Sequence, residues 1–322
     1  MADAGNFSSG RRAQCGCSDY HGCRDQGDIA MKFGISYPDA EIGTDSIVIR
    51  DFAQAVEEMG YNHISTHDHV IQSPTPRESW EMAKFYTTDF PHHEPLTVMA
   101  FLAGVTETIG INPAIVILPQ RQTVLVAKQM AQIDVLSGGR SRFGAGIGWN
   151  SLEFEALGMD FKNRGKRLEE QIEVLRLLWT QQVVTFSGKW HTINEAGLAP
   201  MPIQRPPEIW LGAVSDVAVR RAARLADGWF MISRLAPDDE SRRVADVFRE
   251  AILEAGRDMA DIGIESMVYS KVGGPDDWIA DARAWVDLGA TQLVFRTTEG
   301  GYETFDQHLE AMRTFAEAMK DF

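Results

Sequence analysis

The order of short apolar runs and longer amphipathic runs constrains the fold of this chain more than any other feature. Runs rich in β-branched and aromatic residues, which predict strands, alternate with runs whose apolar side chains recur every three or four residues, which predict helices. The expected strands are Met31–Tyr37, Asn62–Thr66, Ile111–Leu118, Arg140–Gly144, Pro207–Ala213, Gly228–Ser233, Ile262–Tyr269 and Ala290–Arg296. Parallel strands need crossover helices, and eight such strands close into a barrel filled by side chains. We therefore predict an α/β fold of the (β/α)8 TIM-barrel class.

The main alternative is an open, doubly wound sheet, which has a glycine-rich turn after its first strand. Here the first expected strand is followed by Tyr37-Pro38-Asp39, so the sequence favours the barrel. One segment lies outside the repeat. Val183–His191 predicts a small insertion hairpin that turns at Ser187-Gly188.

The first 30 residues differ from the rest in composition, because they are rich in Gly, Ser, Asp and Arg and have little to bury. We predict a disordered N-terminal extension over residues 1–30 and one barrel domain over residues 31–322. All three cysteines, Cys15, Cys17 and Cys23, lie in the extension beside His21. These four side chains form a conceivable zinc site, but their spacing does not match the usual structural zinc motifs, and we predict no metal.

The charge balance limits the partners of the chain. Its net charge is −15, with 31 basic and 46 acidic residues. This excess of acidic residues opposes non-specific binding to nucleic acid or to an anionic membrane, because both need clustered cations. No apolar run approaches the ~20 residues of a membrane helix, and no signal-peptide core is present. We expect a cytoplasmic protein that acts on a small molecule.

The second expected strand ends in His67-Asp68-His69. In an α/β barrel this end of the strands carries the active site. A metal site is one interpretation, although no further His or Asp ligands are evident at the ends of the fourth to sixth strands. Asp68 as a turn or cap residue is a second interpretation. The third is a polar edge beside a redox-active ring, where an imidazole with an unperturbed pKa of ~6.5 is suited to proton transfer.

Two glycine-containing strand ends are candidate cofactor contacts. The fourth strand runs into Gly144-Ala-Gly-Ile-Gly-Trp149, and glycines at alternate positions let a flat ligand approach the backbone. The fifth strand runs into Gly212-Ala-Val-Ser215 directly before a helix. Free N–H groups at that helix start, together with Ser215, are suited to a phosphate. An ordinary N-cap by Ser215 or Asp216 is the alternative.

Longer motifs carry a resemblance to a known family. They are Leu118-Pro-Gln-Arg121, Asp134-Val-Leu-Ser-Gly-Gly-Arg140, Gly144-Ala-Gly-Ile-Gly-Trp149 and Glu153-Phe-Glu-Ala-Leu-Gly158. Together they resemble the bacterial luciferase-like monooxygenase family, and within it the branch of probable coenzyme F420-dependent oxidoreductases. The resemblance extends from Met31 to the C-terminus.

The resemblance implies a cofactor across the barrel mouth: coenzyme F420, or FMN as the alternative. It implies catalytic roles for Asp68 and His69, with His69 as the proton donor or acceptor. The cofactor-binding residues that it implies are Asp68, His69, Ala114, Gly146, Gly148, Trp149, Asn150, Glu153, Gly212, Ala213 and Ser215. Members of the family often have a non-proline cis peptide in the third strand. Here Asn112-Pro113-Ala114 occupies that region, so a proline stands where the cis bond is expected.

Three functions follow as expectations from the resemblance. The first is F420-dependent hydride transfer to or from a small organic substrate. The second is a reduced-FMN-dependent monooxygenase, and the third is a flavin-binding barrel without catalysis. In the sugar-phosphate dehydrogenases of the family a Glu follows the glycine-rich strand, whereas Trp149 stands here and suggests a planar or apolar substrate. Family members are commonly dimers, so a homodimer is one expected assembly.

Overall fold

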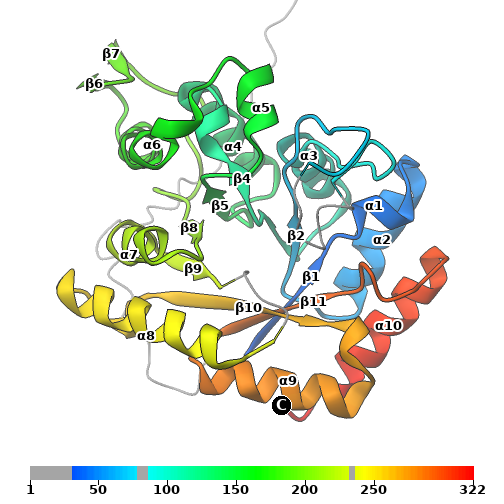
Figure 1. The fold of residues 1–322 in the computed structure, drawn as a ribbon. Helices are drawn as coiled ribbons and strands as arrows, with labels where there is room; N and C mark the ends of the chain where they lie inside the picture. Colours follow the sequence, from blue (N-terminus) through cyan, green and yellow to red (C-terminus); the bar gives the residue numbers. More distant parts are fainter. Residues whose placement is uncertain (1–30, 78–85, 232–235) are drawn as a thin grey trace, which may run out of the picture. The chain divides into compact units, whose positions relative to one another are not determined.

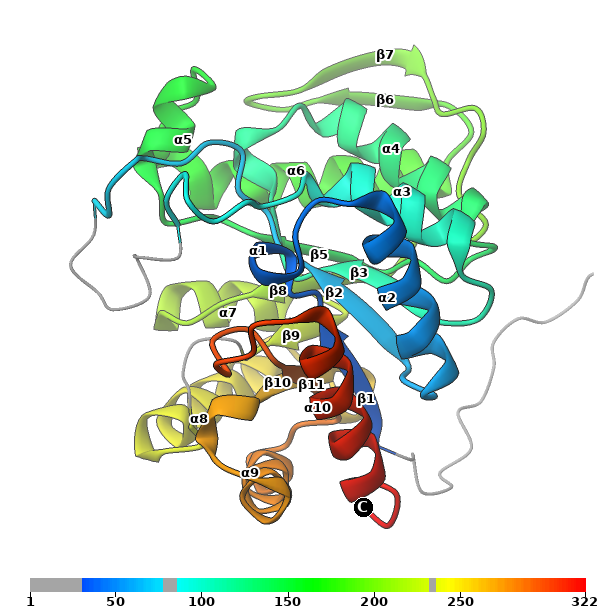
Figure 2. The ribbon, with the colours of Figure 1, turned by 90° about the vertical axis from the view of Figure 1, so that its right-hand side faces the viewer.

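Parallel strands form a barrel with helices on its outside (Figure 1; Figure 2). The computed structural model describes residues 31–77, 86–231 and 236–322, and within these ranges nine strands form the barrel sheet. In sheet order they are β3 (Gly110–Pro113), β2 (His63–Thr66), β1 (Lys32–Ser36), β11 (Gln292–Arg296), β10 (Gly263–Tyr269), β9 (Gly228–Phe230), β8 (Ile209–Gly212), β5 (Phe143–Gly146) and β4 (Val116–Ile117). Strands β3 and β4 are two parts of one barrel strand, so the predicted (β/α)8 barrel is confirmed. The predicted extension and the cysteine cluster lie outside the described residues.

The third barrel strand is interrupted where the sequence predicted an unbroken strand. Ala114 and Ile115 separate its two parts and are joined by a cis peptide. Before the break β3 pairs with β2, and after it β4 pairs with β5. The fourth barrel strand is also displaced from its predicted position at 140–144, because Ser141 forms only an isolated bridge to Ile111 and β5 begins at Phe143.

Each barrel strand is followed by a helix, as the alternation of runs in the sequence predicts. They are α2 (Ser46–Glu58), α3 (Pro95–Val105), α4 (Thr123–Leu136), α6 (Arg164–Thr180), α7 (Asp216–Leu225), α8 (Asp239–Glu254), α9 (Pro275–Asp287) and α10 (Phe305–Ala318). Two short helices, α1 (Asp39–Ile42) and α5 (Ser151–Ala156), were not predicted and follow the ends of β1 and β5. Within the described ranges no helix is both long and apolar enough to span a membrane.

The insertion hairpin lies beside α6 and consists of β6 (Val184–Ser187) and β7 (Thr192–Ala196) (Figure 1). The predicted location is therefore confirmed, but the predicted range of 183–191 misses the second strand. The cause is a wider turn than Ser187-Gly188. Backbone N–H groups of Lys189, Trp190 and His191 all donate to the carboxylate of Glu170 on α6 and hold this turn against the helix.

The barrel interior contains a buried ionic network. Arg142 Nη2 lies 2.5 Å from Glu265 Oε2, and His63 Nε2 lies 3.0 Å from the same oxygen. Arg142 also donates to Asn112 and Gln292, so the network links β2, β3, β10 and β11 to the start of β5. Burial alone would raise the pKa of Glu265, but the nearby Arg142 and His63 outweigh it and hold the pKa at about 2. The carboxylate is therefore charged, and the barrel closes around a charge pair.

We predict that Glu265→Gln lowers the free energy of unfolding by about 3–5 kcal/mol, because it leaves the Arg142 guanidinium in the barrel core without its counter-charge. Urea denaturation measures this change. The matched control is Glu310→Gln, whose partner Arg313 belongs to an exposed pair on α10 and whose loss should cost at most about 1 kcal/mol. Equal effects of the two substitutions would contradict a structural role for the network.

Candidate active site

A cavity of about 500 Å³ lies at the C-terminal ends of the barrel strands. This is where α/β barrels carry their active sites, and the volume suits a small organic ligand. Nine of the residues expected at the site line it: Asp68, His69, Ala114, Gly146, Gly148, Trp149, Gly212, Ala213 and Ser215. The other two do not. The side chain of Asn150 caps α5 by accepting from the N–H of Leu152, and Glu153 is fully buried behind His69.

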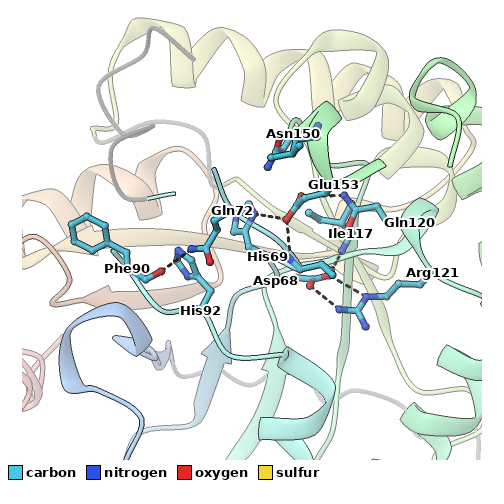
Figure 3. Close-up of polar contacts among 12 residues, drawn as sticks. Asp68, His69, Gln72, Phe90, His92, Ile117, Gln120, Arg121, Asn150 and Glu153 are labelled. Atoms are coloured by element: carbon cyan, nitrogen blue, oxygen red, sulfur yellow. Dashed lines mark hydrogen bonds and ion pairs between the residues drawn. The ribbon is translucent and has the colours of Figure 1, made fainter. Parts of the chain in front are cut away.

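His69 and Glu153 form a buried pair (Figure 3). The imidazole Nδ1 lies 3.1 Å from Glu153 Oε1. Glu153 also accepts from the N–H of Val70 and from Gln120 Nε2. Burial raises the pKa of Glu153, but the hydrogen bonds from His69 and Gln120 outweigh it, so the carboxylate stays charged. A charged carboxylate favours the proton on Nδ1, which leaves Nε2 as the atom that can meet a ligand.

Asp68, which precedes His69, is held by cationic and backbone donors. Arg121 donates to both of its carboxylate oxygens, at 2.7 Å and 3.2 Å, and the N–H of Ile117 donates at 2.8 Å (Figure 3). Arg121 also pairs with Glu94 at the start of α3. The carboxylate of Asp68 therefore fixes β4 next to the end of β2.

The third barrel strand supplies an apolar floor to the cavity through β4 and the two residues before it. The side chain of Ile115 lies where a Cβ on Gly146 would stand, only 2.7 Å from that position, and 3.1 Å from the Cβ position of Gly212. Ile117 lies 2.6 Å from the Cβ position of Gly148, which has φ of +68°. The sequence suggested that these glycines make room for a ligand. In the structure they make room for Ile117 of β4 and for Ile115 just before it, and Ala114, Ile115 and Ile117 line the cavity.

The turn between β8 and α7 forms one edge of the cavity. Ser215 occupies the N-cap position of α7, but its side chain makes no cap hydrogen bond to the helix. Trp229 Nε1 donates to the carbonyl of Ala213 at 3.0 Å and fixes the turn from the core side. The first N–H groups of a helix have no partner within the helix, so this edge is suited to an anion.

Comparison with known proteins identifies the family of this barrel. The model of the luciferase-like monooxygenase family matches residues 31–320. The chain belongs to the luciferase-like monooxygenase family. It is therefore an enzyme of a family whose members are oxidoreductases and monooxygenases, and the resemblance stated above is confirmed.

Its luciferase-like relatives use two different cofactors. An FMNH2-dependent dimethylsulfone monooxygenase from Pseudomonas putida is 33% identical over 56% of this chain and 49% of its own length. An F420-dependent glucose-6-phosphate dehydrogenase from Microbacterium testaceum is 25% identical over 82% of this chain and 75% of its own length. Among solved structures, an F420-dependent secondary alcohol dehydrogenase in complex with an F420–acetone adduct superposes with a TM-score of 0.75, covering 90% of this chain and 99% of that chain at 14% identity. At 14% identity, this superposition shows a similarity of fold.

The luciferase-like cavity has two chemically different sides. One side, which we call the apolar side, comes from the break between β3 and β4 and from β5, β8 and β9, and consists of Ala114, Ile115, Gly146, Gly212 and Phe230. The other, which we call the polar side, comes from the neighbouring strands β11, β1 and β2 and their loops. It consists of Asp39, His67, His92, Arg296 and Thr298.

Within the described residues no group of three or more His, Cys, Asp or Glu side chains is arranged to hold a metal ion.

Sequence reasoning did not single out Asp39, Thr298 and Tyr86, which line the cavity. Asp39 and Thr298 each follow a barrel strand by two or three residues, so their position after a strand end was the available signal. Tyr86 lies in the long loop after β2, which has no periodicity to interpret, and it contacts the rings of His69 and Trp149.

His67 is neutral at the edge of this cavity. Burial, together with the positive charge of Arg296, lowers the pKa of His67 to about 3. Its Nε2 lies 3.5 Å from the hydroxyl of Ser36. His67 is therefore a hydrogen-bonding group rather than a proton carrier at neutral pH.

We predict that His67 makes the protein sensitive to acid. The folded pKa lies below the value of about 6.5 in an unfolded chain, so between these two pKa values the unfolded state binds more protons. Above about pH 6.5, His67 has no effect on the pH dependence of the free energy of unfolding. Below it, His67 lowers that free energy by up to about 1.4 kcal/mol per pH unit. The free energy of unfolding of the wild type should fall more steeply than that of His67→Gln between about pH 6.5 and 4.5. Parallel pH dependences in urea denaturation would contradict this assignment.

Proposed function

We propose that this luciferase-like protein transfers hydride between coenzyme F420 and a small organic substrate. The observation that carries the proposal is the His69–Glu153 pair, which presents one proton-transfer group to a cavity with an apolar floor. The wide coverage of the F420-dependent relative, 82% of the chain against 56% for the FMNH2-dependent one, supports the choice of cofactor.

The residues of the cavity fit such a cofactor. The apolar side offers Ala114, Ile115 and Phe230 to a planar ring system, and the turn at Gly212–Ser215 offers backbone donors and a hydroxyl to a phosphate. When bound, the deazaflavin supplies a two-electron carrier that exchanges hydride and reacts poorly with oxygen. The protein supplies the position of the reacting groups and one proton.

His69 handles that proton. An alcohol carbon that loses hydride must also lose its hydroxyl proton, and this requires a base within hydrogen-bond distance. Nε2 of His69 accepts the proton, while Glu153 holds Nδ1 and stabilises the imidazolium that results. In the reverse direction the same imidazolium donates. Asp68 acts as a positioning residue, because Arg121 and Ile117 occupy both of its carboxylate oxygens.

Trp149 supports a planar or apolar substrate. It lines the cavity, and its ring centroid lies 5.7 Å from that of His69. A glutamate at this position would favour sugar recognition, whereas an indole favours ring stacking. A sugar-phosphate substrate is therefore not part of the proposal.

A reduced-FMN monooxygenase is the second candidate, and the 33% identity with the Pseudomonas putida enzyme supports it. In that case the same anchor would hold the FMN phosphate. A flavin-binding barrel without catalysis is the third candidate, and the buried His69–Glu153 pair argues against it.

A homodimer is also proposed. Exposed apolar side chains on the outer faces of α3 and α4 support it, namely Phe101, Val124, Leu125, Val135 and Leu136.

The cofactor proposal predicts selective binding. We expect titration of the purified protein, followed by cofactor fluorescence, to give at least about tenfold tighter binding of F420 than of FMN, a difference of about 1.4 kcal/mol. Ser215→Asp should weaken F420 binding by a similar factor or more, because it places a negative charge at the phosphate anchor. The control is Val217→Asp, since Val217 is 71% exposed on α7 and does not line the cavity. Selective tight binding of FMN would overturn the F420 proposal.

The proton-transfer proposal predicts a loss of turnover without a loss of cofactor. His69→Gln should lower kcat by about 10²–10⁴-fold while F420 affinity stays within about twofold. Turnover is followed as the change in F420 absorbance with a substrate found by screening small alcohols and carbonyl compounds. The matched control is His191→Gln, which removes another His–Glu pair, formed with Glu170 on α6, and neither residue lines the cavity. If His69→Gln and His191→Gln behave alike, His69 does not transfer the proton.

A further inference from the structure

A second histidine–carboxylate pair lies on the polar side of the cavity. His92, in the loop before α3, has its Nδ1 3.2 Å from Oδ2 of Asp39, the first residue of α1 (Figure 3 shows His92). The side chains of His92 and Asp39 are 8% and 6% exposed, and both residues line the cavity. The pair is thus built as the His69–Glu153 pair is built, with a buried carboxylate holding the Nδ1 side of an imidazole.

The two pairs meet across one small space. The ring centroids of His69 and His92 are 5.3 Å apart. Tyr86 packs against both rings, stacked on His92 at 5.5 Å and edge-on to His69 at 4.4 Å. Both histidines also line the cavity, so the two rings lie next to each other in its wall.

The charges around His92 come from several elements. Burial raises the pKa of Asp39, but the hydrogen bond from His92 and the neighbouring histidines outweigh it, so Asp39 is a carboxylate. Among the residues that the structure describes, the groups around the pair are His67 and His69 after β2, Tyr86 and His93 in the loop before α3, and Arg296 at the end of β11. A charged carboxylate favours the protonated form of the imidazole that it holds.

Two imidazolium rings at this separation repel each other, so protonation of one disfavours protonation of the other. Protonation of the two rings is therefore coupled: when one ring carries the extra proton and donates a hydrogen bond, the other is favoured as the neutral ring that accepts a proton.

We propose that His92, positioned by Asp39, is a second proton-handling group of the active site, and that the reacting oxygen of the substrate lies between His92 and His69. The proposal rests on the proposed function and narrows its substrate class to compounds with a hydroxyl or carbonyl group at the reacting carbon. In oxidation, the O–H proton passes to His69 and the C–H electron pair leaves as hydride to the oxidised coenzyme. The protonated His92 donates a hydrogen bond to the same oxygen, and the imidazolium of His69 then releases its proton to water.

The first test needs neither cofactor nor substrate. Ring signals of isotope-labelled histidines, assigned by His92→Gln and His69→Gln, give the titration of His92 in the intact protein by NMR. We expect Asp39→Asn to move this titration to lower pH by about one unit, because the carboxylate is lost. We expect His69→Gln to move it to higher pH, because a second positive charge is removed. A His92 titration that neither substitution changes would overturn the proposal.

The second test measures catalysis and keeps the two proposals apart. His92→Gln and Asp39→Asn should each lower kcat about 10–100-fold and remove one limb of the pH–rate profile, with F420 affinity unchanged. Asp39→Glu should restore part of the rate, and Glu170→Gln, the matched loss of a histidine-bound carboxylate at the hairpin, should change neither value. A normal pH–rate profile for a folded His92→Gln protein that binds F420 would overturn this inference alone. Failure of the wild type to bind F420 would overturn the proposed function, and the NMR test would still decide the coupling.

Discussion

The carboxylate of Asp68 is the contact on which the geometry of the site depends. It accepts from Arg121 and from the N–H of Ile117, and so holds β4 against the end of β2 after the third barrel strand has been interrupted. With β4 in this place, Ile115 fills the space that the glycines at 146 and 212 leave open. The same contact brings His69, the next residue, to the cavity wall, where Glu153 holds it. One buried ion pair thus determines both the floor of the cavity and the position of His69.

The division of the cavity into an apolar and a polar side follows from the order of the barrel strands. The break between β3 and β4 and the neighbouring strands β5, β8 and β9 provide the apolar side, and β11, β1 and β2 provide the polar side. The apolar side suits the proposed planar cofactor, and the polar side suits the hydroxyl or carbonyl group of the proposed substrate. The luciferase-like family contains F420-dependent and FMNH2-dependent members, and the apolar side together with the helix N-terminus is suited to what those cofactors share.

The fold could be predicted from the sequence because its signals are local: apolar runs and periodicity identify each strand and helix in turn. Residues at strand ends, such as His69 and Ser215, could also be predicted, because the barrel brings all strand ends together. The roles of Glu153 and Asp39 could not, since their partners His69 and His92 lie 84 and 53 residues away in the sequence. The second arm of the hairpin was missed for a similar reason, because Glu170 on another element sets the width of its turn.

A crystal structure of the protein with bound F420 tests the account most directly. The account predicts the phosphate at Gly212–Ser215, the deazaflavin ring on the apolar side against Ile115, and the face of the ring turned toward His69 and His92. It also predicts that the polar side stays open to substrate. A phosphate bound away from the start of α7, or a ring lying against Asp39 and Arg296, would contradict it.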